Sequence, residues 1–332
     1  MRRRILLFIC LVVVTSAPIS AQGTKGNPNP RKITIGMIGK IGKNPVFIAA
    51  YTGAFVAAKE LGAKYKIDVV IDWQTPDVEN VEEQAAAIKR LAESGANGIA
   101  VACTDANYLT PIIDEASNKG IPIACFDSDA PMSKRFAYCG ADDLEFGRML
   151  VKGLVPELKR GGTIAVLAGN RNALNQQRRL AGIRQELKKH PRLSLPSSNV
   201  YHHLETTEAA LETVGRAQKE NPNISGWIFQ GSWALLGKQS MGWKPGEIKV
   251  VAGNAVQAEL ERIKSGDVQA LVGVNCFQMG YEAVGLLLDK ILNDRAPKEP
   301  LRYVPLTLVT KTNVDEWLLN WRKWLLKEAV VR

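Results

Sequence analysis

The chain has 332 residues, of which 46% are hydrophobic and 23% are charged. This balance is typical of a soluble globular protein and excludes a largely disordered chain or one that crosses a membrane many times. The formal net charge is +10, but the basic residues are spread along the chain without a basic arm of interleaved aromatics, so we expect no nucleic-acid binding.

The first 21 residues have the pattern of a secretory signal peptide. Three arginines, Arg2 to Arg4, precede an unbroken apolar run over residues 5–14, and small residues end the segment at Ser20 and Ala21. A bilayer span needs roughly 20 apolar residues and no later run approaches that length, so we expect the mature protein not to cross a membrane. Cys10 lacks the small-residue context of a lipoprotein signal, which favours a released product over a lipid-anchored one.

Four cysteines remain beyond the signal segment, widely spaced and without a CxxC pair: Cys103, Cys125, Cys139 and Cys276. This spacing does not indicate a disulfide scaffold. The first three fall at or near the ends of expected strands, where a free cysteine is more often a small buried hydrophobe than a ligand.

Residues 22–31, rich in Gly, Pro and Asn, predict a flexible tether, after which strands and helices alternate. The first run predicts strands at 32–38, 68–72, 98–102, 121–126 and 136–139, with helices at 47–61, 81–91 and 109–119. The second run predicts strands at 163–167, 200–203, 226–229, 250–252 and 270–274, with helices at 146–158, 177–189, 208–220 and 256–264. This alternation is typical of parallel sheets covered on both faces.

Each run has the size of one domain, so the sequence predicts an α/β protein with two doubly wound lobes. In such folds ligands bind beyond the carboxyl ends of the strands, here in a crevice that both lobes share. The segments that follow the strand ends are 40–47, 127–129, 170–177, 230–233, Asn254 and 274–277.

The last segment predicts an amphipathic helix, because Trp317, Trp321 and Trp324 share one face. We favour a terminal helix packed on the second lobe. The alternative is a helix that binds a membrane surface or a partner, supported by Arg322, Lys323 and Lys327 on its other face.

The motifs of catalysis, metal binding and nucleotide binding are absent from this sequence. His202 and His203 are adjacent on an expected strand and so point to opposite faces, which disfavours a metal site. Gly36, Gly39 and Gly42 do not make GxGxxG, and residues 231–238 depart from a P-loop in length and in the Gln239 that follows. No serine or cysteine has the local signature of a nucleophile, so we expect no catalytic residue and no cofactor.

One interpretation of Asp127 and Asp129 is a paired acid and base. Residues two apart share a face only if the strand continues, and Pro131 indicates that it soon stops, so we favour ligand-holding carboxylates. A cleft of carboxylates, amides and aromatic rings suits a polyhydroxylated small molecule, since planar polar groups pair with vicinal hydroxyls and a sugar's C–H face packs on a ring.

Ordered motifs over residues 32–310 resemble one known family, the ribose-binding-like branch of type 1 periplasmic binding proteins. In the first lobe the motifs are "GKNPVF" (42–47, Val46 aside), "GANGIAVACTDAN" (95–107), "GIPIACFDSDAP" (120–131) and "SKRFAYCGADDLEFGR" (133–148). In the second half they are "NQQRRLAGI" (175–183), "IKVVAGNAVQAELERIKSGDVQALV" (248–272), "FQMGYEAVGLL" (277–287) and "PLTLVT" (305–310).

The resemblance implies a monomeric periplasmic receptor that delivers a sugar or related polyol to the membrane permease of an ABC importer. Asn44, Phe47, Asp127 and Asn254 match the family's ligand-binding positions. Trp233 supplies a stacking ring in one interpretation and packs inside the second lobe in the other. Ser128, Gln177 and Asn275 complete the expected ligand-binding set.

Departures from the family pattern bear on the ligand. Gln177 and Ser128 stand where the family often has arginine, Gly231 where it often has Asn, and Val274 where it often has Gln. Each lost partner leaves a hydroxyl unpaired at a cost of roughly 1–3 kcal/mol, so we expect a ligand other than ribose.

The resemblance also implies lobe boundaries and a hinge. It places residues 32–141 and 275–306 in the first lobe and residues 142–274 and 307–332 in the second, with crossings near Ala141, Val274–Asn275 and Leu306. Hinge closure around one ligand then reports occupancy to the transporter.

Three other functions use a related fold or pocket. A sensing subunit for a chemoreceptor or sensor kinase has the same pocket and differs on its surfaces. A transcriptional repressor core needs an N-terminal helix-turn-helix where this chain has a secretory signal. An exported carbohydrate-acting enzyme needs a placed acid–base pair, which the sequence does not show.

Overall fold

A computed structural model describes residues 30–325 of the chain. The expected signal peptide, residues 1–21, lies outside the described residues, and so do residues 22–29 of the expected tether and residues 326–332, which include Lys327.

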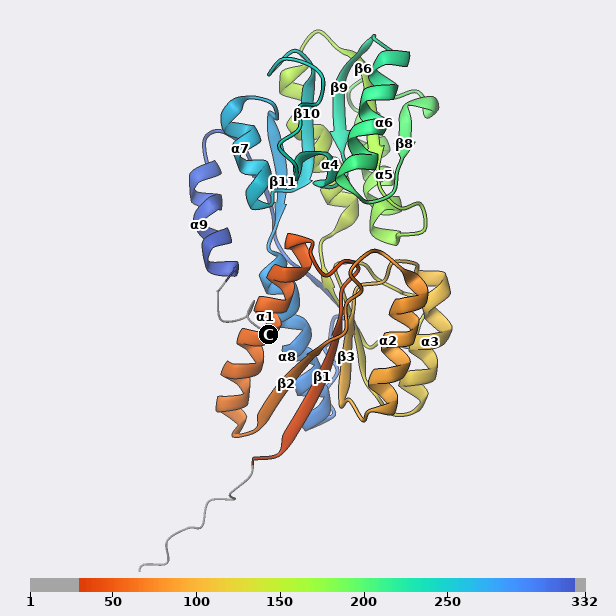
Figure 1. The fold of residues 1–332 in the computed structure, drawn as a ribbon, viewed down its shortest axis with the longest axis vertical. Coiled ribbons are helices and arrows are strands. Elements are labelled where there is room, and N and C mark those ends of the chain that lie inside the picture. Colours follow the sequence, from red (N-terminus) through yellow and green to blue (C-terminus); the bar gives the residue numbers. More distant parts are fainter. Residues whose placement is uncertain (1–29, 326–332) are drawn as a thin grey trace, which may run out of the picture. The chain divides into compact units, whose positions relative to one another are not determined.

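The first sheet has six strands in the order β12-β5-β4-β3-β1-β2, all paired in parallel. The strands are β1 (Lys32–Ile38), β2 (Asp68–Trp73), β3 (Gly98–Val101), β4 (Ile123–Phe126), β5 (Ala137–Gly140) and β12 (Leu301–Tyr303). Four helices cover it: α1 (Pro45–Tyr65), α2 (Val81–Glu93), α3 (Ala106–Asn118) and α8 (Cys276–Asn293). Figure 1 shows α1 and α8 side by side and α2 beside α3. This sheet and its helices are the first lobe.

The second sheet has seven strands in the order β13-β11-β10-β9-β6-β7, with β8 also paired to β6. They are β6 (Gly162–Ala168), β7 (Leu193–Ser194), β8 (Val200–His202), β9 (Ile224–Phe229), β10 (Lys249–Asn254), β11 (Ala270–Val274) and β13 (Leu306–Val309). Only β13 runs antiparallel to its neighbour within this sheet. The helices are α4 (Asp143–Leu154), α5 (Leu174–Leu187), α6 (Thr207–Glu220), α7 (Gln257–Ser265) and α9 (Val314–Trp324). Together they form the second lobe.

The chain passes between the lobes three times. It leaves the first sheet after β5, returns as α8 directly after β11, and leaves again between β12 and β13. The predicted fold class is therefore confirmed: two doubly wound lobes joined by several strands.

Each lobe packs one pair of helices through a pair of glycines. In the first lobe a Cβ on Gly53 would overlap the backbone of Phe277, and one on Gly280 would overlap the carbonyl of Ala50. In the second lobe Gly147 and Gly182 bring α4 and α5 together in the same way. The absence of side chains lets the two backbones touch, so each helix pair is a rigid support for the loops at its end.

Helix α1 is long and apolar enough, by length and composition, to cross a membrane. It contains charged residues and so has no long unbroken apolar run. Just over half of its apolar stretch is buried. Its Ala49, Ala54 and Ala57 are fully buried in the core that α1 shares with α8. Within residues 30–325, this burial is that of a core helix.

The tryptophan face of α9 packs on the second lobe, as the favoured interpretation predicted. The indole N–H groups of Trp317 and Trp321 both donate to the carbonyl of Ala255, at 2.9 and 2.6 Å. Trp324 is buried against both rings. The hydrogen bonds satisfy the buried indole N–H donors. The tryptophan face is therefore packed against the protein and unavailable to a membrane.

The four cysteines beyond the signal segment are free and buried, in agreement with the sequence. Hydrophobic periodicity did not predict helix α8 (Cys276–Asn293), and only the family motif at 277–287 fell within it.

Candidate functional site

A small cavity of about 30 Å³ lies between the lobes at the carboxyl ends of the strands. We call it the enclosed cavity because most of its lining residues are buried. A cavity of this volume is large enough for a water molecule and far smaller than a typical ligand pocket. The first lobe contributes Lys40, Asn44, Val46, Phe47 and Asp127; the second contributes Asn175, Gln176, Arg179, Glu205, Trp233 and Asn254. Five of the eight expected ligand-binding residues therefore meet in one place.

The start of α1 positions Asn44 and Phe47. The Asn44 side chain accepts a hydrogen bond from the Val46 amide at 3.0 Å and so caps the helix, while Pro45 begins it. Phe47 is buried and meets Phe126 edge to face at 6.3 Å between centroids. Cap and core thus fix one amide and one ring at the cavity wall.

Asp127 follows the last residue of β4 in a left-handed conformation, with φ 55°. Its backbone carbonyl accepts a hydrogen bond from the Tyr138 hydroxyl at 2.9 Å. Its side chain has no hydrogen bond or ion pair among the described residues, although only 8% of the residue is exposed. Burial raises the pKa of this carboxyl, against the opposing charges of Lys40 and Arg179. The carboxylate is an unused acceptor inside the cavity.

Lys40 contributes an ammonium group to the cavity, and only 2% of the residue is exposed. Its Nζ lies 4.0 Å from Oε1 of Glu79. Burial alone lowers its pKa, but the carboxylates of Glu205, Glu79 and Asp127 outweigh burial, so the pKa is raised. Lys40 therefore stays charged.

Arg179 faces the cavity from α5 and is held on several sides. Its Nε donates to Asp143 at 2.9 Å and its Nη1 to the carbonyl of Gln230 at 2.8 Å. The guanidinium lies 3.8 Å from the centroid of the Phe146 ring. Burial raises the pKa of Asp143 to about 7, against the lowering effect of Arg179. The arginine is neutralised and fixed before any ligand arrives.

Trp233 and Asn254 complete the wall on the second lobe. Trp233 is 4% exposed, and its ring meets His203 edge to face at 5.1 Å. A Cβ on Gly231 would lie 2.6 Å from that ring, so the position of Trp233 requires glycine there. Trp233 is thus both packed in the lobe and exposed to the cavity. Asn254 adopts φ 84°, and Arg179 Nη1 donates to its Oδ1 at 3.5 Å.

Three expected residues do not line the enclosed cavity. Ser128 is fully buried beyond it. Asn275 caps α8, its Oδ1 accepting from the Gln278 amide at 3.0 Å. Gln177 donates to the carbonyl of Arg171 at 2.7 Å and lines a separate hollow of about 330 Å³. Helix α5 begins at Leu174, three residues earlier than expected, which turns Asn175 and Gln176 toward the cavity instead.

Three charged residues outside the expected ligand-binding set line the cavity: Lys40, Arg179 and Glu205. Lys40 begins one of the strand-end segments, so its position was a usable signal. Arg179 lies one helical turn after Asn175, on the same face, which an earlier start for α5 would have revealed. Glu205 follows a short strand and carried no local signal.

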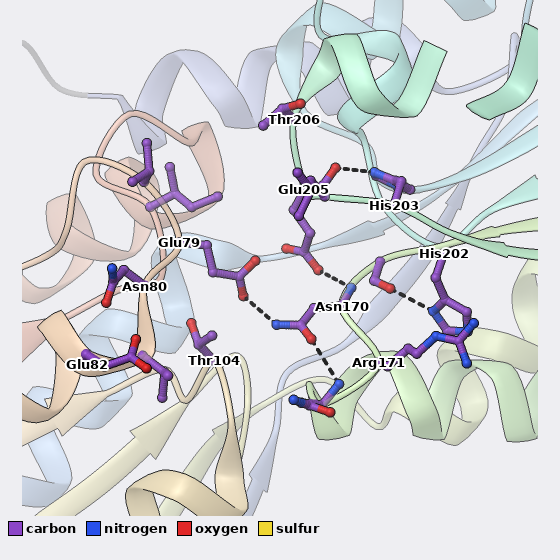
Figure 2. Close-up of a pocket in the computed structure, with 16 residues that line it drawn as sticks. Glu79, Asn80, Glu82, Thr104, Asn170, Arg171, His202, His203, Glu205 and Thr206 are labelled. Atoms are coloured by element: carbon purple, nitrogen blue, oxygen red, sulfur yellow. Dashed lines mark hydrogen bonds between the residues drawn. The ribbon is translucent and has the colours of Figure 1, made fainter. Parts of the chain in front are cut away.

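An outer cavity of about 850 Å³ adjoins the first at Glu205, which lines both. Figure 2 shows Glu79 of the first lobe and Glu205 of the second on either side of Asn170. The Asn170 amide N–H donates to Glu205 Oε1 at 3.0 Å, and its side-chain Nδ2 donates to Glu79 Oε1 at 3.4 Å. Asn170 therefore connects the lobes at the mouth of the site.

Strand β8 ends at His202, one residue earlier than expected, so the expected strand alternation between His202 and His203 does not extend to His203. Both residues line the outer cavity. His202 contacts the carbonyl of Gly169 at 2.9 Å. Burial lowers the pKa of His203, which favours the neutral ring.

A family model described as "Periplasmic binding protein domain" matches residues 35–294, well over half of the chain. The chain belongs to this family. The match includes every residue that lines the enclosed cavity.

Two curated relatives are similar to the chain. A xylitol-binding protein of Mycolicibacterium smegmatis is 24% identical over 71% of this chain and 67% of its own length. The ribose import binding protein of Bacillus subtilis is 23% identical over 42% of this chain, and the match spans 44% of that protein's length.

Solved structures share the fold. A solute-binding protein of Burkholderia graminis, solved with D-arabinose, has a TM-score of 0.78 at 23% identity and covers 86% of this chain and 97% of its own. The glucose-galactose binding protein of Geobacillus stearothermophilus has a TM-score of 0.77 at 21% identity, covering 85% and 99%.

Proposed function

We propose that this chain is an extracytoplasmic solute-binding protein. It captures a sugar or related polyol between its lobes and delivers it to the membrane permease of an ABC importer. The observation that carries the proposal is the enclosed cavity, in which both lobes contribute polar atoms and aromatic rings and the Asp127 carboxylate has no partner. The family and the sugars and polyol named for the relatives support the solute class.

Each part of the wall has a role in this proposal. Asp127 accepts hydrogen bonds from adjacent hydroxyls, Asn44 and Asn254 add paired amides, and Phe47 and Trp233 cover the C–H faces of the solute. Hydrogen bonds to hydroxyls and ring packing of this kind bind a solute without any chemical reaction.

Capture requires the lobes to part, because a volume of about 30 Å³ does not hold a sugar ring. The hinge lies where the chain crosses between the sheets, near Ala141, Val274–Asn275 and Leu306. A solute that touches both lobes favours the closed arrangement by its higher affinity for it. The signal-like segment at residues 1–21 supports export to the periplasm.

A thermal-shift screen of the chain from Gln22 onward tests the proposal. The panel contains pentoses, hexoses, linear polyols and inositols, and a solute that binds the native state raises the melting temperature by mass action. We expect at least one hit that Asp127→Asn abolishes. Asp68→Asn is the matched control, because Asp68 is exposed at the opposite end of β2. Silence across the whole panel would contradict the proposal.

A further inference from the structure

Carboxyl groups outnumber basic groups around the enclosed cavity. Arg179 is paired with Asp143 at 2.9 Å. Among the described residues, Lys40 is then the one ammonium group beside three carboxyl groups at this site, those of Glu79, Asp127 and Glu205. Carboxylates kept from water are costly unless a positive charge is close, so this arrangement favours one more cation.

Several hydrogen-bond acceptors at the site are also without a donor in the described structure. The Asp127 carboxylate accepts no hydrogen bond in the described structure, and Oε1 of Gln176 is buried without a donor. Glu205 accepts only from the Asn170 amide. An ammonium group carries three donors and no acceptor, whereas a hydroxyl brings an acceptor with each donor.

The position of Glu205 adds a mechanical reason. It lies on the second lobe where the two cavities join, and Glu79 faces it from the first lobe (Figure 2). Two like charges on opposite lobes repel each other when the cleft closes. Lys40 supplies one positive charge beside both groups, and a second cation between them favours the closed arrangement further.

We propose that the solute carries an ammonium group, as an amino sugar or an aminated polyol does, and that Glu205 is the residue that selects it. This inference rests on the proposed function, and it adds the charge of the ligand. Asp127 and the amides still bind hydroxyls; Glu205 distinguishes the amine from its neutral parent.

The titration of Glu205 agrees with this geometry. Burial, with the charges of Glu79 and Asp127, raises its pKa to about 7, while Lys40 and the Asn170 amide oppose the shift. Other chargeable groups that line the two cavities are Glu82, Arg171, Arg179, His202 and His203. An ammonium beside Glu205 lowers its pKa again, so binding near pH 7 releases a proton.

Calorimetry with matched ligand pairs tests the inference. The pairs are glucose with glucosamine, galactose with galactosamine, and D-glucitol with 1-amino-1-deoxy-D-glucitol, all at pH 7. For at least one pair we expect the amine to bind wild-type protein at least tenfold more tightly than its parent. In Glu205→Gln that ratio falls to about one. Glu83→Gln is the matched control, because Glu83 is exposed on α2 and lines neither cavity.

A second readout needs no variant. Titrating wild-type protein with the amine in two buffers of different ionisation enthalpy should reveal proton release, and the neutral parent should release none.

The outcomes separate the two proposals. If neutral parents bind as tightly as their amines, the inference is overturned and the proposed function stands. If neither class binds, the proposed function fails and the inference with it. An amine preference that survives in Glu205→Gln removes the role assigned to Glu205.

Discussion

At the end of β4 in the first lobe and at the end of β10 in the second, the backbone makes the same unusual turn. Asp127 has φ 55° and Asn254 has φ 84°, and both residues line the enclosed cavity. Each lobe also supports its cavity wall with a helix pair that touches through glycines, Gly53 with Gly280 and Gly147 with Gly182. The two lobes therefore present similar scaffolds to the ligand.

The lobes treat their charged groups differently. In the second lobe Arg179 is held by Asp143, by the carbonyl of Gln230 and by the Phe146 ring. In the first lobe the Asp127 carboxylate has no such partner in the described structure, and Lys40 reaches its nearest carboxylate only at 4.0 Å. The comparison teaches that a charge at the cavity wall is not by itself a ligand contact. A charged group that already has protein partners shapes the wall, and one without partners is available to bind a ligand.

Removing Asp143 should have the largest effect on stability. Asp143→Ala leaves the guanidinium of Arg179 buried without its counter-charge, and we expect a loss of about 3–5 kcal/mol in the free energy of unfolding. Asp127→Asn should change it by less than about 1 kcal/mol, since no partner is lost. Urea denaturation of both variants measures the difference. Equal losses would contradict the distinction between the lobes.

The glycine contacts come next. Gly280→Ala places a methyl group against the carbonyl of Ala50, and Gly182→Ala does the same against Leu144 in the other lobe. Each should destabilise the fold by about 3 kcal/mol, because backbone cannot move aside cheaply. Gly215→Ala on α6, where the added Cβ meets open space, is the control and should not destabilise. A melting temperature unchanged in Gly280→Ala would show that the helix contact is looser than described.

A smaller effect is expected from pH. Glu205 and Asp143 both have a pKa of about 7 in the folded state, well above that of an exposed carboxyl. Between the pKa of an exposed carboxyl and pH 7, the folded protein holds protons on these two groups that the unfolded chain has released. Their contribution to stability is therefore full at low pH and falls as pH rises toward 7. From pH 5 to 8, Glu205→Gln should lose less melting temperature than the wild type. Parallel curves for the two proteins would refute this.

The smallest effect should come from Gln177. Its side chain is used by the carbonyl of Arg171 and lies outside the enclosed cavity. Gln177→Ala should change the affinity for the bound solute less than twofold, measured by calorimetry beside Trp233→Ala, which removes a ring from the wall and should weaken binding clearly. A tenfold loss in Gln177→Ala would restore it to the site.

Much of the fold was predictable because each strand and helix has its own periodicity. The expectation that ligands bind beyond the strand ends then selected Asp127, which directly follows β4, and Asn254, which is the last residue of β10. Arg179 and Glu205 escaped because their burial depends on partners far away in sequence, Asp143 for one and Asn170 for the other. The sequence extended strand β8 by one residue to His203. The end of this short strand is set by its pairing with β6, which the local sequence pattern does not show.

The most direct test of the central claim is calorimetric titration of wild-type protein and Asp127→Asn with the solute that the thermal screen selects. The account predicts one binding site per chain in the wild type and at least a hundredfold weaker binding in a variant that remains equally stable. Equal affinity in the two proteins would show that the solute binds elsewhere and that the unpartnered carboxylate is not its ligand.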